Sequence, residues 1–462
     1  MTRSGARTLS RALAFTAGLI LIGGELSGCA GFKVPTPPNP FNFGGGKEKK
    51  ASARVAPGQR IPVLQSSLTL EPAPALKGVD FSIPAPQPQA SWPLPGGNAE
   101  QAVENVAAGA DLKIAWRRKV GAGDTRFTHI MATPVAGDGR IYMLDGRAQV
   151  AALDPTNGRE LWRADLSTKK GMDREAFGGG VAFADGMVFV SSGYRFVAAL
   201  EASTGRQLWR VDTSSPVHGA PTVAAGKVYV IDVVDQLQAF DAKTGASAWT
   251  YQPLEEPARM LIASSPAVTG DQVVAPFASG ELVAVSAANG TDLWTDVLSL
   301  TSRNNALSEI RDIAGRPAIY RGMVYAGSHS GVLGAVDLRT GQRAWSLPIA
   351  MISAPWPAGD VVYAVGQQGE VICAARDSGQ IYWINRLNAS LGKKQQQEWS
   401  GPILASSRLV MVSDKGELLA LDPKTGKQIS TLRLGAPAFM TPIATGGMLY
   451  VLTNTGEMIA IR

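Results

Sequence analysis

The sequence contains little cysteine and little histidine. Its 462 residues include two cysteines, Cys29 and Cys373, and three histidines, His129, His218 and His329. Disulfide scaffolds, zinc fingers and iron–sulfur sites need more thiols, or thiols closer together, so the sequence excludes these classes. The three histidines are far apart along the chain and no H-E-x-x-H motif occurs, which argues against a metal site.

Charged side chains are also scarce, and their signs nearly balance. There are 44 Lys and Arg residues against 38 Asp and Glu residues, which gives a net charge of +6. So small and scattered an excess does not indicate a nucleic-acid partner. Hydrophobic residues make up 45% of the chain, enough for a large core, while 51 glycines and 29 prolines disfavour a helical bundle or a coiled coil.

The first 28 residues have the composition of an export signal. Arg3, Arg7 and Arg11 form a basic start, and residues 12–24 form an apolar run. A run of about 13 residues is too short to span a bilayer comfortably, and it fits the hydrophobic region of a signal peptide. We therefore expect residues 1–28 to be a signal peptide.

The end of this signal, Leu26-Ser27-Gly28-Cys29, resembles the lipobox of bacterial lipoproteins. The resemblance implies cleavage before Cys29 and acylation of its sulfur and its new amine, a combination that anchors a protein stably. Residue 30 is Ala rather than the Asp that typically retains such proteins in the inner membrane, so the outer membrane is the expected destination. The alternative is an ordinary secretory signal with an incidental cysteine.

Residues 29–111 are predicted to carry the lipid and to form a Pro-rich tether. Thirteen of the 29 prolines lie between Pro35 and Pro95. Proline cannot donate ladder hydrogen bonds and favours extended polyproline II. Residues 60–64 and 91–97 also carry apolar side chains, which could dock on the folded domain or on a partner. Docking on the chain's own domain is the simpler interpretation.

Residues 112–462 contain a repeated motif. An apolar position and an Asp-like position are followed by a Thr/Asn/Ser–Gly turn and then, four residues after the glycine, by a tryptophan. The period is 38 to 51 residues, which is typical of solenoid and propeller units. Six copies end in tryptophan, and a seventh has Ser430 in its place: Trp162, Trp209, Trp249, Trp294, Trp345 and Trp383.

Each repeat also has a front half, usually opened by a proline, with two further short apolar runs separated by a glycine-bearing turn. Four short antiparallel strands per unit make a propeller blade. Eight front halves occur, and the last ends at Arg462 without a Trp strand; residues 113–120, with Trp116, look like the missing strand. We therefore predict an all-β, eight-bladed β-propeller closed by an N-terminal strand, which leaves no open ring.

The repeated tryptophans are predicted to be structural, because a large aromatic side chain suits packing between blades. A cofactor-binding set is the alternative for Trp116, Trp162, Trp209, Trp249, Trp294, Trp345 and Trp383. The recurrent acidic residue should accept hydrogen bonds from its own turn rather than act as a catalytic carboxylate. This applies to Asp154, Asp241, Asp337 and Asp422.

The repeat resembles that of the PQQ-like propellers, and two families within this class compete. The lipobox, the tether, the eight blades and the closing strand are similar to the BamB family, the lipoprotein subunits of the outer-membrane β-barrel assembly machinery. The other family is the quinone-dependent dehydrogenases, whose members usually carry an adjacent Cys-Cys pair and a Glu/Asn/Asp set for calcium. Cys373 stands alone in a predicted strand, where a free cysteine behaves as a small hydrophobe. We therefore expect no catalytic residue, no cofactor and no metal.

The BamB resemblance implies a non-enzymatic scaffold, lipid-anchored on the periplasmic face of the outer membrane. The implied partner is the central, BamA-like barrel-assembly subunit with its complex; unfolded outer-membrane proteins are a second candidate. No nucleic acid is expected. Besides the dehydrogenase, a periplasmic sensor or binding propeller is an alternative.

Binding is expected at the connections between blades, since variable loops on a rigid scaffold usually carry it. The BamB resemblance implies contacts with the barrel subunit at two of these connections: Arg259, Met260 and Leu261 before one blade, and Arg311 and Asp312 before the next. The match is partial, since the family's Asp-x-Asp has Ala314 as its second member here and Arg259 is displaced. The three histidines are expected on the same face but on separate blades. Solvated loops with no special role are the alternative.

Overall fold

A computed structural model describes residues 70–126, 128–167, 177–253, 264–299 and 312–462 of the chain. These residues belong to one compact unit, Pro62–Arg462. Their regular structure consists of strands β1–β32 and a single short 3₁₀ turn, η1 (Pro74–Leu76). Within the described ranges, no helix is both long enough and apolar enough to cross a membrane. The signal peptide, Cys29 and residues 60–64 lie outside them.

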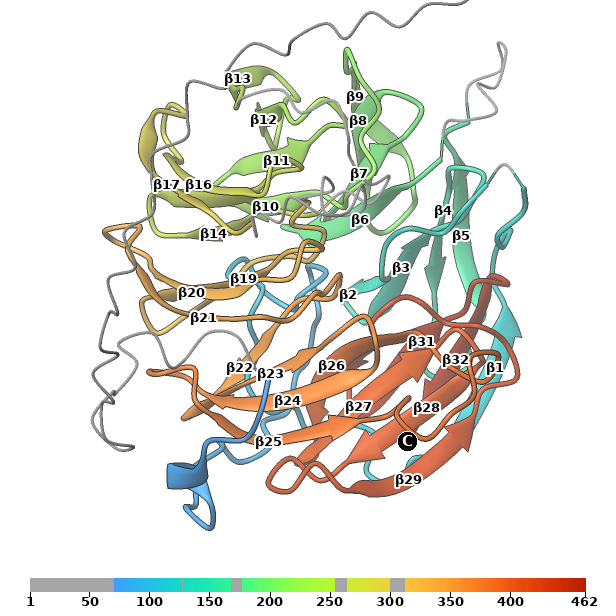
Figure 1. Ribbon diagram of the computed structural model, residues 1–462. Coiled ribbons are helices and arrows are strands. Elements are labelled where there is room, and N and C mark those ends of the chain that lie inside the picture. Colours follow the sequence, from blue (N-terminus) through green and yellow to red (C-terminus); the bar gives the residue numbers. More distant parts are fainter. Residues whose placement is uncertain (1–69, 127, 168–176, 254–263, 300–311) are drawn as a thin grey trace, which may run out of the picture. The chain divides into compact units, whose positions relative to one another are not determined.

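The strands form eight four-stranded antiparallel sheets (Figure 1). Blades 1 and 2 consist of β2 (Val135–Gly137), β3 (Arg140–Leu144), β4 (Gln149–Leu153), β5 (Glu160–Asp165), β6 (Gly179–Ala184), β7 (Met187–Ser192), β8 (Phe196–Glu201) and β9 (Gln207–Asp212). Blades 3 and 4 consist of β10 (Thr222–Ala224), β11 (Lys227–Ile231), β12 (Leu237–Asp241), β13 (Ser247–Tyr251), β14 (Ala267–Thr269), β15 (Gln272–Pro276), β16 (Glu281–Ser286) and β17 (Asp292–Val297).

The second half of the ring repeats this plan. Blades 5 and 6 consist of β18 (Ala318–Tyr320), β19 (Met323–Gly327), β20 (Leu333–Asp337), β21 (Arg343–Leu347), β22 (Trp356–Ala358), β23 (Val361–Val365), β24 (Glu370–Ala375) and β25 (Ile381–Arg386). Blades 7 and 8 consist of β26 (Trp399–Ala405), β27 (Arg408–Ser413), β28 (Glu417–Leu421), β29 (Gln428–Arg433), β30 (Ile443–Thr445), β31 (Met448–Leu452), β32 (Glu457–Ile461) and β1 (Ile114–Lys119). The predicted eight-bladed propeller is confirmed.

Blade 8 is closed by the N-terminal strand, as predicted. β1 pairs antiparallel with β32, and Trp116 lies opposite Ala460. Beyond the strand ends, the N–H of Lys113 donates to the carbonyl of Arg462 at 3.0 Å, and the N–H of Arg462 donates back at 2.9 Å. The two ends of the propeller are therefore joined by the same ladder that joins neighbouring strands within a blade.

The burial of each strand follows its position in the blade. The middle strands have neighbours on both edges and both faces, so β23 is buried along its whole length. The outermost strands have one free edge, and β17 has exposed and half-buried positions around the buried Trp294. The pattern of buried and exposed positions therefore distinguishes the middle strands of a blade from its outermost strand, in addition to indicating which segments are strands.

The repeated tryptophans fasten each blade to the next. Each indole N–H donates to a carbonyl of the following blade, at 2.7 to 3.1 Å. Each ring also covers the glycine of that blade's turn, where an added Cβ would lie 2.4 to 2.7 Å from the tryptophan. These glycines have φ between +68° and +75°, a region that glycine enters without steric cost. In the structure, the seven tryptophans thus pack against and hydrogen-bond to the neighbouring blades.

The one seam without a tryptophan has a physical reason. Ser430, on the outermost strand of blade 7, stands where the indole would face the turn of blade 8. In blade 8 that turn does not exist, because the chain's closing strand and its C-terminal strand meet there instead. There is thus no glycine turn for an indole to cover.

Part of the Pro-rich segment is built into the propeller. Trp92 is 1% exposed and Val106 is fully buried. Residues 89–106, which we call the plug, form hydrogen bonds with all eight blades. The blade-side groups, in blade order, belong to Ala136, Phe183, Thr222, Val268, Ile319, Trp356, Leu404 and Gly446. Residues 91–97 therefore dock on the chain's own domain.

Candidate functional site

The two faces of the propeller differ in what covers them. In each blade the inter-blade connection and the second-to-third strand turn emerge on one side, which we call the connection face. The first-to-second strand turns and the Thr–Gly turns emerge on the other, the turn face. The plug bonds to the innermost strands close to the turn face; the N–H of Val268 reaches Ala99 at 2.7 Å, and that of Gly446 reaches Gln89 at 2.9 Å. The centre of the ring is therefore closed at the turn face.

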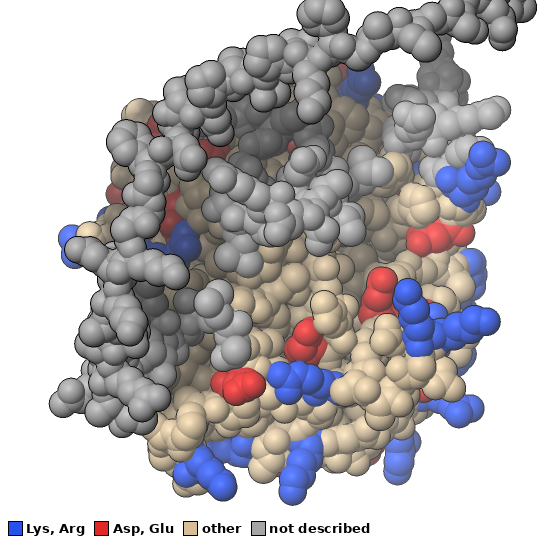
Figure 2. Space-filling view, viewed as in Figure 1, with Lys and Arg blue, Asp and Glu red and all other residues tan. Residues whose placement is uncertain are grey.

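A cavity of about 550 Å³ lies at the centre of the connection face. Its lining comes from the inter-blade connections and second-to-third strand turns of most blades, and Pro95 of the plug borders it. In Figure 2 the Lys and Arg side chains gather mainly toward the lower and right margins of the view, and the middle is largely uncharged. The cavity is therefore a concave site with a largely uncharged lining.

Several polar groups border this cavity without a partner. Arg316 Nε, Gln367 Nε2 and Trp399 Nε1 are enclosed and have no hydrogen-bond acceptor among the described residues. Burial lowers the pKa of Arg316 to about 10 and lowers the pKa of His329, which also borders the cavity. The sequence reading did not single out Arg316, Gln367 or Trp399 for the centre of the ring, because none of them belongs to the repeated motif.

The histidines come closer together than the sequence suggests. Phe177 lies between His129 and His218, at ring-centroid distances of 5.2 and 4.8 Å, with the His218 ring stacked. His129 and His329 both border the central cavity. Connections from separate blades converge near the ring's centre, which spacing along the chain does not reveal. No cluster of three His, Cys, Asp or Glu suited to a metal occurs in the described ranges.

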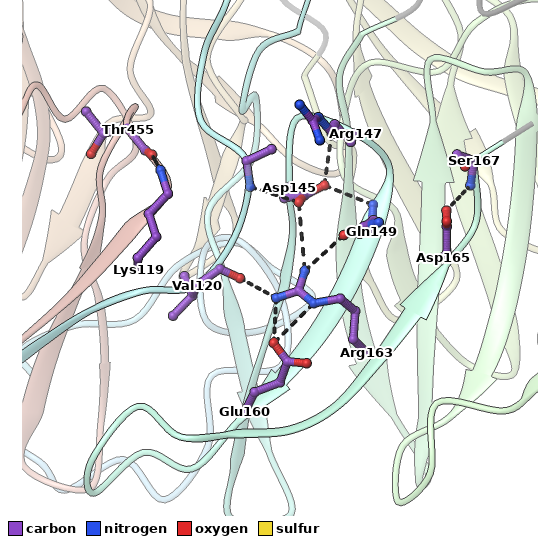
Figure 3. Close-up of polar contacts among 11 residues, drawn as sticks. Lys119, Val120, Asp145, Arg147, Gln149, Glu160, Arg163, Asp165, Ser167 and Thr455 are labelled. Atoms are coloured by element: carbon purple, nitrogen blue, oxygen red, sulfur yellow. Dashed lines mark hydrogen bonds and ion pairs between the residues drawn. The ribbon is translucent and has the colours of Figure 1, made fainter.

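A polar network joins the closing strand to blade 1 (Figure 3). Arg163 donates to the carbonyl of Val120 at 2.6 Å and to Glu160 at 2.6 Å, and lies 3.8 Å from Asp145. Asp145 also accepts three backbone N–H groups, from Ala122, Arg147 and Gln149, at 2.8 to 3.0 Å. Because these charges are engaged with each other and with the backbone, the network is suited to holding the seam rather than to chemistry.

The acidic residues of the Thr–Gly turns are engaged in the same way. In Asp154, Asp241, Asp337 and Asp422, a carboxylate oxygen accepts the hydroxyl and the N–H of the turn threonine at 2.6 to 2.9 Å. These hydrogen bonds, the threonine hydroxyl first, lower the pKa of the Asp154, Asp241 and Asp337 carboxyls. Glu201 accepts Thr204 in blade 2 at 2.6 Å, a member that the sequence reading missed. The predicted turn role is confirmed.

Of the residues expected to contact a partner, only Asp312 is described. It is 3% exposed, and its carbonyl accepts the N–H of His329 at 2.8 Å. It therefore lies beneath the connection face rather than projecting from it. Arg259, Met260, Leu261 and Arg311 lie outside the described residues.

The residues present do not fit the dehydrogenase cofactor with its calcium. Cys373 is fully buried in β24 and has no neighbouring cysteine in sequence, and burial raises the pKa of its thiol well above the ordinary value. The Cys-Cys pair that the dehydrogenase resemblance implies is therefore missing. The described part of the chain also lacks a group of three acidic or histidine side chains for the cation.

Comparison with known families gives a consistent result. The family model described as outer membrane protein assembly factor BamB matches residues 146–385 and 389–462. A model of the β-propeller domain of glucose, ethanol and alcohol dehydrogenases matches residues 102–186. BamB of Burkholderia pseudomallei is 26% identical over 365 residues, covering 76% of this chain and 88% of the relative. BamB of Salmonella typhimurium is 28% identical over 356 residues, covering 75% and 88%.

Solved structures share the fold. The crystal structure of BamB from Moraxella catarrhalis superposes with a TM-score of 0.62 at 20% identity, covering 70% of this chain and 94% of that one. Quinohemoprotein alcohol dehydrogenase from Comamonas testosteroni also gives 0.62, at 14% identity, covering 80% of each chain. At these identities the similarity shows the shared propeller fold and does not separate a scaffold from an enzyme.

Proposed function

This chain belongs to the BamB family of outer membrane protein assembly factors, and from this premise we propose that it is a non-enzymatic scaffold that binds the central barrel-assembly subunit. Its role would be to position that subunit during folding and insertion of outer-membrane β-barrel proteins. The observation that carries the proposal is the family match over most of the propeller, together with the misfit of the cavity to a quinone and its calcium.

We assign the partner to the connection face. The plug bonds to the inner ends of all eight blades close to the turn face, whose Thr–Gly turns are short and uniform. The connections vary in length and converge around the central cavity. A partner that recognises this protein specifically would bind the variable side, at or near Arg259, Met260, Leu261 and Arg311, with the buried Asp312 beneath this face.

The lipidation of Cys29 would hold the protein at the periplasmic face of the outer membrane. The first described residue after Cys29 is Leu70, 41 positions further along the chain, and its carbonyl already accepts a hydrogen bond from Arg386 at 2.8 Å. Extended chain spans up to about 3.3 Å per residue. A tether of this length leaves the orientation of the connection face to be set by the partner rather than by the anchor.

The blade edges offer a second contact, with unfolded outer-membrane strands. Each outermost strand ends its sheet, so one backbone edge has no strand partner within the described sheets. Large apolar side chains are exposed on these strands, at 39% to 49% of their area: Leu161, Leu208, Leu293, Val297 and Ile429. Such edges suit β-augmentation by an extended segment. Absence of client cross-links at these five positions would remove this part of the proposal.

The main test is affinity purification of the tagged, lipidated protein from outer membranes in mild detergent, with mass spectrometry. We expect recovery of the barrel-assembly subunit, and its loss in the double variant Met260→Asp/Leu261→Asp. The matched control, Lys243→Asp/Arg339→Asp, changes two exposed residues of the Thr–Gly turns and should recover the subunit as the wild type does. Recovery of no subunit, with quinone-dependent dye reduction by the pure protein, would contradict the proposal in favour of a dehydrogenase.

A further inference from the structure

The central cavity gathers polar atoms that the protein itself does not satisfy. Six side chains bordering it each have an enclosed nitrogen or oxygen atom without a hydrogen-bond partner among the described residues: Thr133, Ser264, Arg316, His329, Gln367 and Trp399. Buried polar groups are nearly always paired, because leaving one unpaired costs its full desolvation. Six such atoms around one cavity indicate a ligand that pairs with them.

The donors outnumber the acceptors. Arg316 Nε, Gln367 Nε2 and Trp399 Nε1 can only donate, while the two hydroxyls and the imidazole can donate or accept. The group that satisfies them must therefore be an acceptor with several lone pairs. Carboxylates and phosphates are such groups.

Arg316 adds a charge that has no counterpart. None of the described carboxylates forms an ion pair with its guanidinium, and desolvation is the only influence on its pKa, which stays well above neutrality at about 10. The acidic residues at the cavity's border are used elsewhere or face solvent. Asp124 accepts the N–H of Ile130 and the amide of Asn454, and Glu398 is exposed. Arg316 is half-buried, and a cation partly removed from water is stabilised when an anion joins it.

The single positive charge and the apolar walls of the cavity limit the class of ligand that it can bind. Burial lowers the pKa of His329, so this imidazole is neutral at pH 7 and Arg316 supplies a single positive charge. One positive charge balances a monoanion better than a phosphate monoester or a polycarboxylate quinone. Ile130, Ile352, Phe439 and Met440 also border the cavity and give it apolar walls. Its volume of about 550 Å³ lies in the range of small-molecule sites.

We propose that the central cavity binds a small monocarboxylate, whose carboxylate takes hydrogen bonds from Arg316, Gln367 and Trp399 and whose apolar body lies against Phe439 and Met440. The site opens on the connection face, at the centre of the surface assigned to the protein partner. It does not depend on that assignment, because it rests on the chain's own unpaired donors.

Isothermal titration of the purified full chain tests the ligand class. The probes are 4-phenylbutyrate, the uncharged 4-phenylbutan-1-ol, and inorganic phosphate. We expect the carboxylate to bind at least about tenfold more tightly than either of the others, because only it offers both the charge and the apolar body. Equal binding of the alcohol, preferential binding of phosphate, or no binding of the carboxylate would overturn the proposal.

Substitutions of Arg316 and Trp399 test whether the carboxylate binds in the central cavity. Arg316→Gln should weaken 4-phenylbutyrate binding by about tenfold or more, while Arg159→Gln, at an exposed turn position, should leave it unchanged. Trp399→Phe removes one donor and should weaken binding by a few fold, which keeps the test valid if the Arg316 variant does not fold. Unchanged binding in both Arg316→Gln and Trp399→Phe would place the ligand elsewhere and overturn the proposal.

A second readout needs no ligand. Arg316→Met replaces a half-buried charge that has no ion-pair partner among the described residues by an apolar side chain of similar length, so it should raise the melting temperature of the ligand-free protein while weakening binding. A residue that merely supports the fold would lower the melting temperature. A lower melting temperature with retained carboxylate binding would contradict the role given to Arg316.

Discussion

At the scale of single residues, the glycines of the Thr–Gly turns do two things at once. Gly290 has φ +74°, and a Cβ there would lie 2.6 Å from Cε3 of Trp249. Gly139 has a similar φ of +67°, but nothing lies within 4 Å of its added Cβ. Substituting Gly139 therefore tests backbone strain alone, whereas substituting Gly290 tests backbone strain together with the loss of tryptophan packing.

We predict that Gly139→Ala lowers the free energy of unfolding by about 1 kcal/mol, through backbone strain alone. Gly290→Ala should lower it by about 3 kcal/mol, because Trp249 must also move. Chemical denaturation of both variants measures the difference. Equal losses would mean that the contact between turn and indole contributes nothing.

Arg163 contacts Val120 after the closing strand and both Glu160 and Asp145 of blade 1, so it holds this seam together. Arg163→Met leaves the carboxylate of Asp145, a residue 5% exposed, without its cation, although three backbone N–H groups remain. We predict a loss of about 2 kcal/mol in the free energy of unfolding. Arg206→Met, which breaks the exposed pair with Glu201, should cost much less, because water screens this pair. A similar loss in the two variants would contradict this account.

At the scale of elements, the outermost strand of each blade and the turn before it were the parts of the fold that the sequence predicted most fully. The Asp, the Gly and the Trp of the motif each satisfy a local requirement: the turn's N–H groups, a positive φ and the seam. The glycine therefore lies four residues before the tryptophan in all six copies that end in tryptophan. Glu201 was not read as a member, because the longer side chain does not match the Asp pattern, although it accepts the same threonine hydroxyl.

These carboxylates predict a pH dependence. The folded-state pKa values of Asp154, Asp241 and Asp337 are lowered, so each carboxyl stabilises the fold above its unfolded pKa, and this contribution is lost as the pH falls through the folded value. The melting temperature should thus fall below about pH 4. The triple Asp→Asn variant should show a shallower fall, since an amide oxygen can still accept the threonine hydroxyl but carries no charge to be lost. Parallel melting curves for both proteins would contradict the assignment.

At the scale of the whole molecule, closure and the plug make one ring from eight similar units. The number of blades and the closing strand could be predicted, because both follow from counting motifs. Docking of residues 91–97 on the chain's own domain was also expected, but the plug's contacts with every blade could not be predicted, since these hydrogen bonds are made with residues up to about 350 positions away and Pro-rich composition alone indicates an extended chain. The cavity was missed for the same reason: its polar side chains come from separate blades and share no motif.

The plug should contribute to stability as a packed element. Trp92 is 1% exposed and its ring stacks on Trp356, with the two centroids 6.4 Å apart. We predict that Trp92→Ala lowers the free energy of unfolding by about 3 to 5 kcal/mol. It should also speed hydrogen exchange at Ala136 and Val268, whose N–H groups bond to the plug.

Val79→Ala is the matched control for this prediction. Val79 lies in the same N-terminal segment but is 49% exposed, so its substitution should change neither stability nor exchange. If exchange at Ala136 and Val268 in the Trp92 variant matched that of the wild type, the plug would not depend on this side chain.

The central claim, that the protein works as an assembly scaffold through its connection face, is tested most directly by site-specific photocrosslinking in intact cells. The cross-linker would be placed at Leu261 on the connection side and at Arg339 on the turn side. The account predicts that Leu261 captures the barrel-assembly subunit and that Arg339 does not. Capture from Arg339 alone, or of no outer-membrane assembly component from either position, would contradict it.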